Sequence, residues 1–339
     1  MRQIALLIVA VSLAAAPLSA AVLELQGSSQ ISSPRLAAGD LDGDGDDELI
    51  AGGRVGPFVP VTEPVGARRA AIEASAMVRL STGLELQKPL ASYDHLKVVE
   101  DVGAGDVDGD GRDEIVAVGD RKICILALRQ GRLEVQALHE VESGRLWRVD
   151  LADVDGDGRD EMAVAAIEVA ADDGDPASSV VTVYDADPHL AERASLSVDA
   201  HIGDLCFGDF DGDGQTQLAL ELGREEIGGI VQLYDVGGGF LSEQSIQQLT
   251  DDGERALGLV AQAAGGQDRL ALATVRGQLL VARQIGTRLQ VVAGQAMPGG
   301  SLPLRSIASI GEAGPARAAE LLATGGSPAG LWRVTGMGF

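Results

Sequence analysis

The chain has 339 residues, of which 45% are hydrophobic and 45 are Gly, and its formal net charge is -25. This composition is typical of a globular, turn-rich β protein and excludes a disordered or collagen-like chain. Nucleic acids and anionic membrane surfaces attract Lys and Arg, so the acidic charge argues against both as partners.

The first 21 residues have the organisation of a secretory signal peptide. Arg2 precedes an apolar run from Ile4 to Ala16, and small residues suited to cleavage follow at Ser19, Ala20 and Ala21. The apolar run is too short to span a bilayer. We therefore expect residues 1–21 to be removed and residues 22–339 to form a single secreted or periplasmic domain without membrane insertion.

One acidic stretch recurs along the chain and is clearest between residues 105 and 119. Asp106, Asp108 and Asp110 alternate, so a tight loop can direct all three carboxylates inward. Arg112 would contribute its backbone carbonyl, and Glu114 would close the ligand shell. A hard oxygen set of this kind suits calcium, whereas zinc and copper prefer His or Cys. The sequence therefore predicts a calcium loop.

An EF-hand is the alternative for such a loop, but the following residues disfavour it. Position 12, where an EF-hand has a bidentate Glu, is Ala117, and the β-branched run Ile115–Val118 is typical of a buried strand. Three further copies begin at Asp40, Asp153 and Asp209, and the third of these has Gln217 where the others have Glu. Calcium is therefore predicted at three sites and more weakly at a fourth. The remaining candidate ligands are Asp40, Asp42, Asp44, Asp46, Glu48, Asp153, Asp155, Asp157, Arg159, Glu161, Asp209, Asp211 and Asp213.

Two decayed copies follow the four acidic loops and extend the repeat to the end of the chain. Their first positions align with Ala261 and Glu312, so the copies are spaced at 66, 47, 56, 52 and 51 residues. Each interval can hold four strands, which in the second interval are expected at 97–102, 115–118, 122–128 and 132–138. Such spacing predicts four-stranded propeller blades.

The two ends of the repeat region complement each other. The last copy stops after its third strand, whereas Val22–Gln26 resembles the fourth strands of other copies, such as Leu133–Gln136. We therefore expect an all-β fold, a β-propeller of six four-stranded blades closed by the N-terminal strand. Seven blades is the less favoured count.

The stretch that begins at Gly105 resembles the FG-GAP and VCBS repeats, whose calcium loops also occur in the propellers of integrin α-subunits. The resemblance covers most of residues 22–339. It implies a β-propeller that binds calcium between the first and second strands of a blade. The family usually has Asp where this chain has Glu48, Glu114 and Glu161. Gln217 departs further from the pattern, and the two decayed copies are expected to bind no metal.

The sequence contains no zinc-protease, phosphate-loop, dinucleotide or nucleophile-elbow motif. We therefore expect no catalytic residues and no organic cofactor. The predicted function is an exported, monomeric binding, adhesion or protein-interaction module with an unknown protein or glycan partner.

The alternative is a propeller enzyme such as a polysaccharide lyase. It would use the face opposite the calcium loops, where strand direction places His95, His201, Trp147 and Arg148, with Arg35 in the channel. Two long insertions, Arg54–Ala76 and Glu168–Ser178, are expected on the same face. Their length favours a function for that face.

Overall fold

The fold is described from a computed structural model of the chain. The described residues are 22–27, 31–55, 70–80, 83–168, 178–185, 189–224, 227–237, 239–250, 254–263, 266–296, 304–310, 320–325 and 330–335. The predicted signal peptide, residues 1–21, lies outside them, as does the sixth copy of the loop. Among the described residues, no helix is long and apolar enough to span a membrane.

Every element in the described part of the chain is a β-strand. The strands are β1 (Val22–Gly27), β2 (Ile31–Gly39), β3 (Glu48–Val55), β4 (Ala70–Leu80), β5 (Gly83–Leu96), β6 (Asp101–Gly105), β7 (Glu114–Gly119), β8 (Lys122–Arg129), β9 (Arg132–Glu140), β10 (Arg145–Ala152), β11 (Glu161–Ile167), β12 (Ser179–Tyr184), β13 (Glu192–Val198), β14 (His201–Gly208), β15 (Gln217–Arg224), β16 (Ile227–Gly237), β17 (Phe240–Gln248), β18 (Ala256–Gln262), β19 (Arg269–Thr274), β20 (Gln278–Ile285), β21 (Arg288–Ala296), β22 (Leu304–Ile310), β23 (Glu320–Gly325) and β24 (Gly330–Thr335). The expected all-β class is confirmed.

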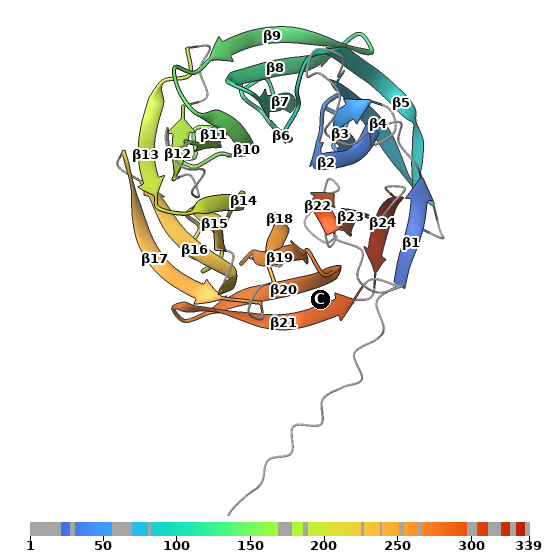
Figure 1. The fold of residues 1–339 in the computed structure, drawn as a ribbon. Coiled ribbons are helices and arrows are strands. Elements are labelled where there is room, and N and C mark those ends of the chain that lie inside the picture. Colours follow the sequence, from blue (N-terminus) through green and yellow to red (C-terminus); the bar gives the residue numbers. More distant parts are fainter. Residues whose placement is uncertain are drawn as a thin grey trace, which may run out of the picture.

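The strands pair into antiparallel four-stranded sheets. Five sheets are sequential, β2-β3-β4-β5, β6-β7-β8-β9, β10-β11-β12-β13, β14-β15-β16-β17 and β18-β19-β20-β21, and a sixth has the order β1-β24-β23-β22. Figure 1 shows the first-named strands β2, β6, β10, β14 and β18, together with β22, around a common centre. Each of these inner strands contacts the next in cyclic order.

The strand β1 pairs with β24, although the two lie at opposite ends of the described chain. Their register runs antiparallel from Val22 opposite Thr335 to Gly27 opposite Leu331. In this position β1 is the outermost strand of its sheet, the place that β5, β9, β13, β17 and β21 take in the others. The edge of β24 is thereby paired.

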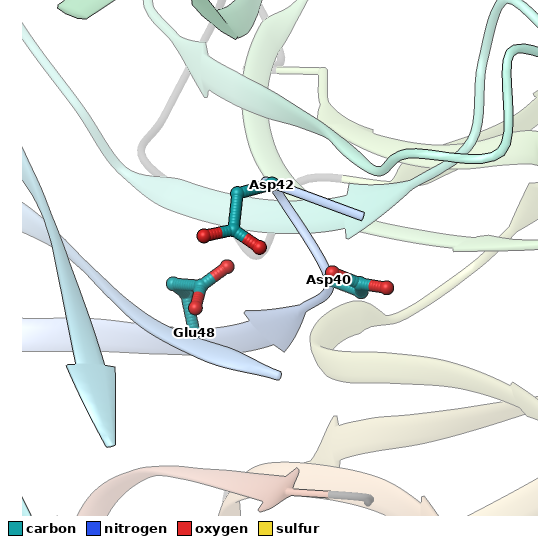
Figure 2. Close-up of side chains that lie close together, drawn as sticks. All are labelled: Asp40, Asp42 and Glu48. Carbon is teal, nitrogen blue, oxygen red and sulfur yellow. The ribbon is translucent and has the colours of Figure 1, made fainter. Parts of the chain in front are cut away.

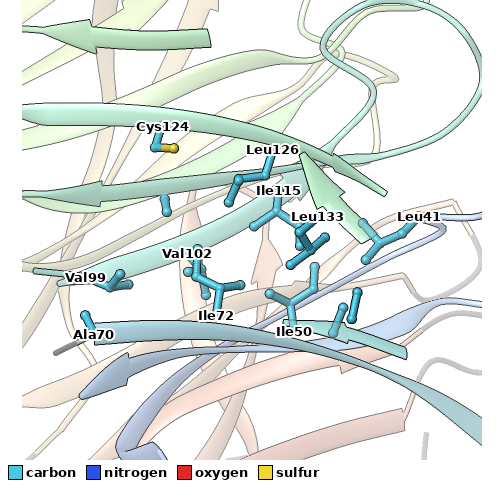
Figure 3. Packing of buried hydrophobic residues seen from close by; sticks show 13 residues of the cluster. Leu41, Ile50, Ala70, Ile72, Val99, Val102, Ile115, Cys124, Leu126 and Leu133 are labelled. Atoms are coloured by element: carbon cyan, nitrogen blue, oxygen red, sulfur yellow. The ribbon is translucent and has the colours of Figure 1, made fainter. Parts of the chain in front are cut away.

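The core consists of apolar layers between neighbouring sheets. Inner, second and third strands of neighbouring sheets all contribute to these layers. A strand covered on both sides is buried throughout, as in β7, whose residues are all buried. Ile50 and Ile72 from one sheet pack with Val102, Ile115 and Leu126 from the next (Figure 3). By contrast, the outermost strand β9 has mostly exposed or half-buried residues.

Most expected strands of the second interval were correct to within a few residues, but the first begins later, at Asp101. The expected insertion Arg54–Ala76 is shorter than predicted, because β3 continues to Val55 and β4 already begins at Ala70. The rest of that insertion, residues 56–69, and most of the second insertion, residues 169–177, lie outside the described residues. Cys124 and Cys206 are both free and buried, and each packs within an apolar core cluster.

Candidate metal centres

The four acidic loops each join an inner strand to the second strand of its sheet and bring carboxylates together. In the first three loops the convergent groups are the first, third and ninth loop residues, and in the fourth loop the first, third and fifth. One oxygen from each lies within 4.8 Å of the others. Figure 2 shows Asp40, Asp42 and Glu48 of the first loop directed toward one another. The clusters are Asp40, Asp42, Glu48; Asp106, Asp108, Glu114; Asp153, Asp155, Glu161; and Asp209, Asp211, Asp213.

The first Asp of each loop also shapes the loop itself. The Oδ1 atom of Asp106 accepts hydrogen bonds from the backbone N–H of Gly109 (2.7 Å) and Asp110 (3.1 Å), and Oδ2 accepts one from Gly111 (2.8 Å). Gly109 and Gly111 have φ values of 76° and 85°, which a side chain would disfavour. The sequence thus folds the loop around the carboxylate that heads it.

The ninth residue lies under the loop at the start of the second strand. Glu114 is 2% exposed, and its Oε2 accepts the backbone N–H of Val107 at 3.1 Å. Its other oxygen lies on the side of Asp108, because Gln136 Nε2 is 3.3 Å from Glu114 Oε1 and 3.4 Å from Asp108 Oδ2. Burial, with the neighbouring Asp108 charge, raises the pKa of Glu114 to about 7. A buried carboxylate among like charges is stabilised by a bound cation.

The same arrangement holds in the first and third loops. The N–H of Leu41 donates to Glu48 Oε2 at 3.0 Å, and the N–H of Val154 donates to Glu161 Oε2 at 2.9 Å. Burial raises the pKa of Glu48 to about 7 and raises that of Glu161 as well. The longer Glu therefore reaches the cluster in all three loops where the related repeats usually have Asp.

The fourth loop keeps the geometry but inverts one polar contact. Gln217 Oε1 accepts the N–H of Phe210 at 3.1 Å, as the Glu does elsewhere. Its Nε2 then donates to Asp211 Oδ2 at 3.2 Å and to Asp235 Oδ1 at 3.4 Å. An amide donor thus stands where the other loops present a carboxylate oxygen, so this loop has one anionic ligand fewer.

A positively charged side chain from another strand, Arg193 of β13, contacts the carboxylates of the third loop. Arg193 Nη1 lies 2.9 Å from Asp155 Oδ2, 3.1 Å from Glu161 Oε1 and 3.5 Å from Asp185 Oδ1. Asp155 and Glu161 are two members of the third cluster. No sequence pattern indicates this contact, because Arg193 lies more than thirty residues beyond the loop.

The remaining predicted ligands lie within the loops but outside the closest clusters. In the fifth position, Asp44, Asp110 and Asp157 each accept a backbone N–H from the seventh residue, at 2.9 Å, 3.0 Å and 2.9 Å. The seventh residues are those predicted to offer a carbonyl, Asp46, Arg112 and Arg159. The Arg112 side chain lies against Gly43 of the preceding loop, and Arg159 lies in the same way against Gly109.

Paired hydrogen bonds that sequence reasoning missed join the first loop to the second, the second to the third and the fourth to the fifth copy. Between the third and fourth loops, Thr216 Oγ1 instead donates to the backbone oxygen of Asp153 at 3.4 Å. The N–H of Asp113 donates to the backbone oxygen of Asp40, and the N–H of Asp40 donates to Asp113 Oδ2, both at 2.9 Å. Asp160 joins Asp106 in the same way, and Asp268 of the decayed fifth copy joins Asp209. We call this arrangement the loop clasp. Only its eighth-residue Asp is needed, so the clasp persists where the metal ligands are lost.

The centre of the ring is filled by charged side chains at one register position. Each inner strand contributes the residue four positions before its last paired residue. These residues are Arg35, Asp101, Arg148, Asp204, Gly258 and Ser306. Arg148 is 1% exposed, forms an ion pair with Asp204 at 3.1 Å and donates to the backbone oxygen of Gly203 at 2.7 Å. Arg35 donates to the backbone oxygen of Leu257 at 2.9 Å. Arg148 and Asp204 are thus paired with each other, and Arg35 is bonded to the backbone of another inner strand.

A cavity of ≈ 100 Å³ adjoins this ring and is lined by Asp101, Asp150 and Asp204. Their carboxylates connect neighbouring inner strands, because Asp101 accepts the N–H of Val149, Asp150 that of Phe207 (2.8 Å) and Asp204 that of Leu259 (2.7 Å). Burial raises the pKa of Asp150 to about 7. These contacts hold the inner strands together.

The face opposite the loops carries the aromatic and His residues that were predicted there. Trp147 and His201 are in edge-to-face contact at 5.7 Å, and Arg145 lies 5.6 Å from the Trp147 ring centre. His95 is exposed and contacts Tyr93 and Asp94 instead. The two His therefore have different neighbours. Arg148 lies beside Trp147 as predicted, with its guanidinium 4.3 Å from the ring centre, and it also forms the buried ion pair with Asp204.

The comparisons with known proteins agree with this geometry. Residues 106–164, which include the second and third loops, match the FG-GAP-like repeat family. Among solved structures, the chain resembles that of BBS1N in complex with ARL6DN, soaked with lead, with a TM-score of 0.55 and 12% sequence identity over 93% of this chain and 82% of that one. No curated protein sequence matches significantly. The chain is therefore an all-β protein of β-propeller fold that contains an FG-GAP-like repeat at residues 106–164.

Proposed function

We propose that this protein is an exported, monomeric calcium-binding propeller that serves as a protein-interaction or adhesion module. In this proposal the six sheets are six blades of one ring that β1 closes. The cyclic contacts of the inner strands and the pairing of β1 with β24 support that count.

The observation that carries the calcium proposal is the convergence of carboxylates in loops whose backbone is already ordered. Three carboxylate oxygens within 4.8 Å of one another, one of them in the first three loops from a buried Glu, repel unless a cation lies between them. The ligand set is all oxygen, without His or Cys, which suits Ca²⁺. When bound, the ion would cross-link the start of the second strand to the loop and so stiffen one end of each blade.

The interaction surface in this proposal is the face opposite the loops. It exposes Arg145 beside Trp147 and His201, and it holds buried polar atoms without a partner among the described residues, namely Trp147 Nε1, Glu221 Oε2 and Arg255 Nε. BBS1N, of similar fold, was solved in complex with another protein, which is consistent with this role.

The enzyme alternative receives less support. Its proposed residues do not converge, because His95 lies with Tyr93 and Asp94 whereas His201 lies with Trp147 and Arg255. Arg148 is occupied by Asp204 and two backbone oxygens. A general acid or base must lie within hydrogen-bonding reach of the substrate. The two His have separate surroundings, so this arrangement does not bring them together on one substrate.

Affinity capture from the envelope fraction of the source organism tests this proposal. Wild-type protein, Trp147→Ala and Asp108→Ala are immobilised with calcium or with chelator, and the retained proteins are identified by mass spectrometry. We expect a specific partner that Trp147→Ala loses and that Asp108→Ala retains in saturating calcium. A partner lost only by Asp108→Ala, with its fold intact, would move the interaction to the loop face. Calcium binding itself is measured separately by calorimetry.

A further inference from the structure

The outermost strand of several sheets carries one extra residue at the same position, beside the metal loop. Between β8 and β9 the register steps from Ile125 opposite Ala137 to Leu126 opposite Val135, which leaves Gln136 unpaired. The corresponding steps in the next sheets leave Arg193, Gln244 and Val292 unpaired. A β-bulge of this kind turns the extra side chain away from the face that the normal alternation of side chains along the strand would give it. In the second and third sheets the bulge brings the side chain, Gln136 or Arg193, onto the loop carboxylates.

The bulge residue differs from sheet to sheet. In the first sheet the same step leaves Leu90, which is apolar and 40% exposed. In the second sheet neutral Gln136 contacts Asp108 and Glu114. In the sheet whose loop has decayed the residue is Val292, which is apolar and 48% exposed. Only the third sheet places a full positive charge there, since Arg193 reaches Asp155 and Glu161 within 3.1 Å.

We propose that Arg193 is a built-in cation that occupies the third loop and must be displaced before calcium can bind there. This inference rests on the proposed calcium function. The guanidinium and a calcium ion would compete for the same two carboxylates, Asp155 and Glu161. Asp185 is 46% exposed and lies 3.5 Å from Arg193 Nη1, so it can retain the guanidinium after displacement.

The four loops should therefore rank in calcium affinity in an order that their ligand sets alone do not predict. The first and second loops have full ligand sets and no internal cation among the described residues. The third has a full set neutralised by Arg193, and the fourth has Gln217 in place of an anionic ligand. The protein should therefore have two tighter and two weaker calcium sites. The third loop should also stay ordered without metal, since its carboxylates already have a counter-charge.

Calorimetric calcium titration of the full mature chain tests this inference with reciprocal variants. Arg193→Gln introduces the residue of the second sheet, and we expect one site to gain about tenfold in affinity. Asp155→Ala in that background should remove the gained site. The reverse change, Gln136→Arg, should weaken the second site by a similar factor. Arg121→Gln removes a positive charge from an exposed ion pair with Glu140 on the other face and should change nothing.

Melting temperatures in chelator separate this inference from the calcium proposal. Without metal, Arg193→Gln should melt below Arg121→Gln, because Asp155 and Glu161 lose their counter-charge, and Gln136→Arg should melt above wild type. If no variant binds calcium, the proposed function fails. The order of the metal-free melting temperatures still shows whether Arg193 neutralises Asp155 and Glu161. The inference is overturned if Arg193→Gln matches Arg121→Gln in both calcium affinity and metal-free melting.

Discussion

The Nε atom of Arg148 lies 3.1 Å from Oδ1 of Asp204, and the pair is buried at the centre of the ring of sheets. Burial raises the pKa of Asp204 and lowers that of Arg148 to about 10, so each charge depends on the other. Removing one partner leaves the other charge buried without compensation. Arg148→Met should therefore lower the free energy of unfolding by about 3 kcal/mol in denaturant titrations.

The pair is separated from a general packing effect by a double-mutant cycle. Asp204→Asn keeps a hydrogen-bond acceptor for the N–H of Leu259 while removing the charge. The double variant should lose less stability than the sum of the two single variants. Additive losses would show that Arg148 contributes by filling space and not by pairing with Asp204.

Replacing the Asp at the first loop position should lower stability without metal more than replacing the Asp at the third position. Asp108→Ala removes a ligand that accepts one backbone N–H, whereas Asp106→Ala removes a ligand that accepts three. Both variants should lose one calorimetric calcium site. In chelator, Asp106→Ala should cost an additional 1–3 kcal/mol or so of unfolding free energy, because backbone donors lose their acceptor. An unchanged calcium stoichiometry in Asp108→Ala would refute the ligand assignment.

The fourth loop should become a stronger site through one substitution. Gln217→Glu replaces the amide donor that now faces Asp211 with a carboxylate oxygen, while its other oxygen still accepts the N–H of Phe210. Its calcium affinity should rise by roughly tenfold or more, because affinity follows the number of charged ligands. Gln215→Glu is the comparison for charge alone, since it adds the same charge to the same loop at an exposed position and removes one amide donation, to Asp213 Oδ2 (3.2 Å). Equal gains in the two variants would mean that general charge, and not ligation, is responsible.

The buried carboxyl of Asp150 should make stability depend on pH. Burial raises its pKa from 3.8 to about 7, with Asp204 and Asp101 acting in the same direction. The folded state therefore holds the proton more tightly than the unfolded state. The resulting stabilisation is complete below about pH 4 and is lost as the pH rises through 7.

Asp150→Asn tests this dependence, because the amide oxygen can still accept the N–H of Phe207. Relative to wild type, the variant should gain about 2–3 kcal/mol of unfolding free energy between pH 5 and pH 8. Urea titrations at fixed calcium across this range provide the measurement. Parallel stability curves for the two proteins would show that Asp150 is not the titrating group.

The sequence predicted what is local in this fold. The spacing of Asp106, Asp108 and Glu114 sufficed to place three carboxylates together, because nine consecutive residues determine that loop. The strands were also predictable from their apolar runs. The start of β4 at Ala70 was not, because the alanine-rich segment that begins there lacks the β-branched pattern of the other strands.

Contacts between strands distant in sequence were beyond prediction. Arg193 reaches the third loop because a bulge between β12 and β13 turns it there, and no sequence pattern marks the bulge. Arg148 was predicted beside Trp147 and His201, and it does lie over the Trp147 ring. Its ion pair with Asp204 was not predictable, because a bulge at Trp147 brings Arg148 to the position where it meets Asp204.

The loop clasp has a consequence for the order in which the protein folds. A metal loop closes over nine consecutive residues, so an ion can be captured as soon as one sheet forms. A clasp joins residues 73 apart at Asp40 and Asp113 and 54 apart at Asp106 and Asp160, so it forms only once the following sheet has docked. Closing such long loops is slower than closing the metal loop. Calcium would thus act early, within single sheets, and the clasps would later register the sheets that they join, including at Asp268, where the fifth copy contributes to assembly after losing its ligands.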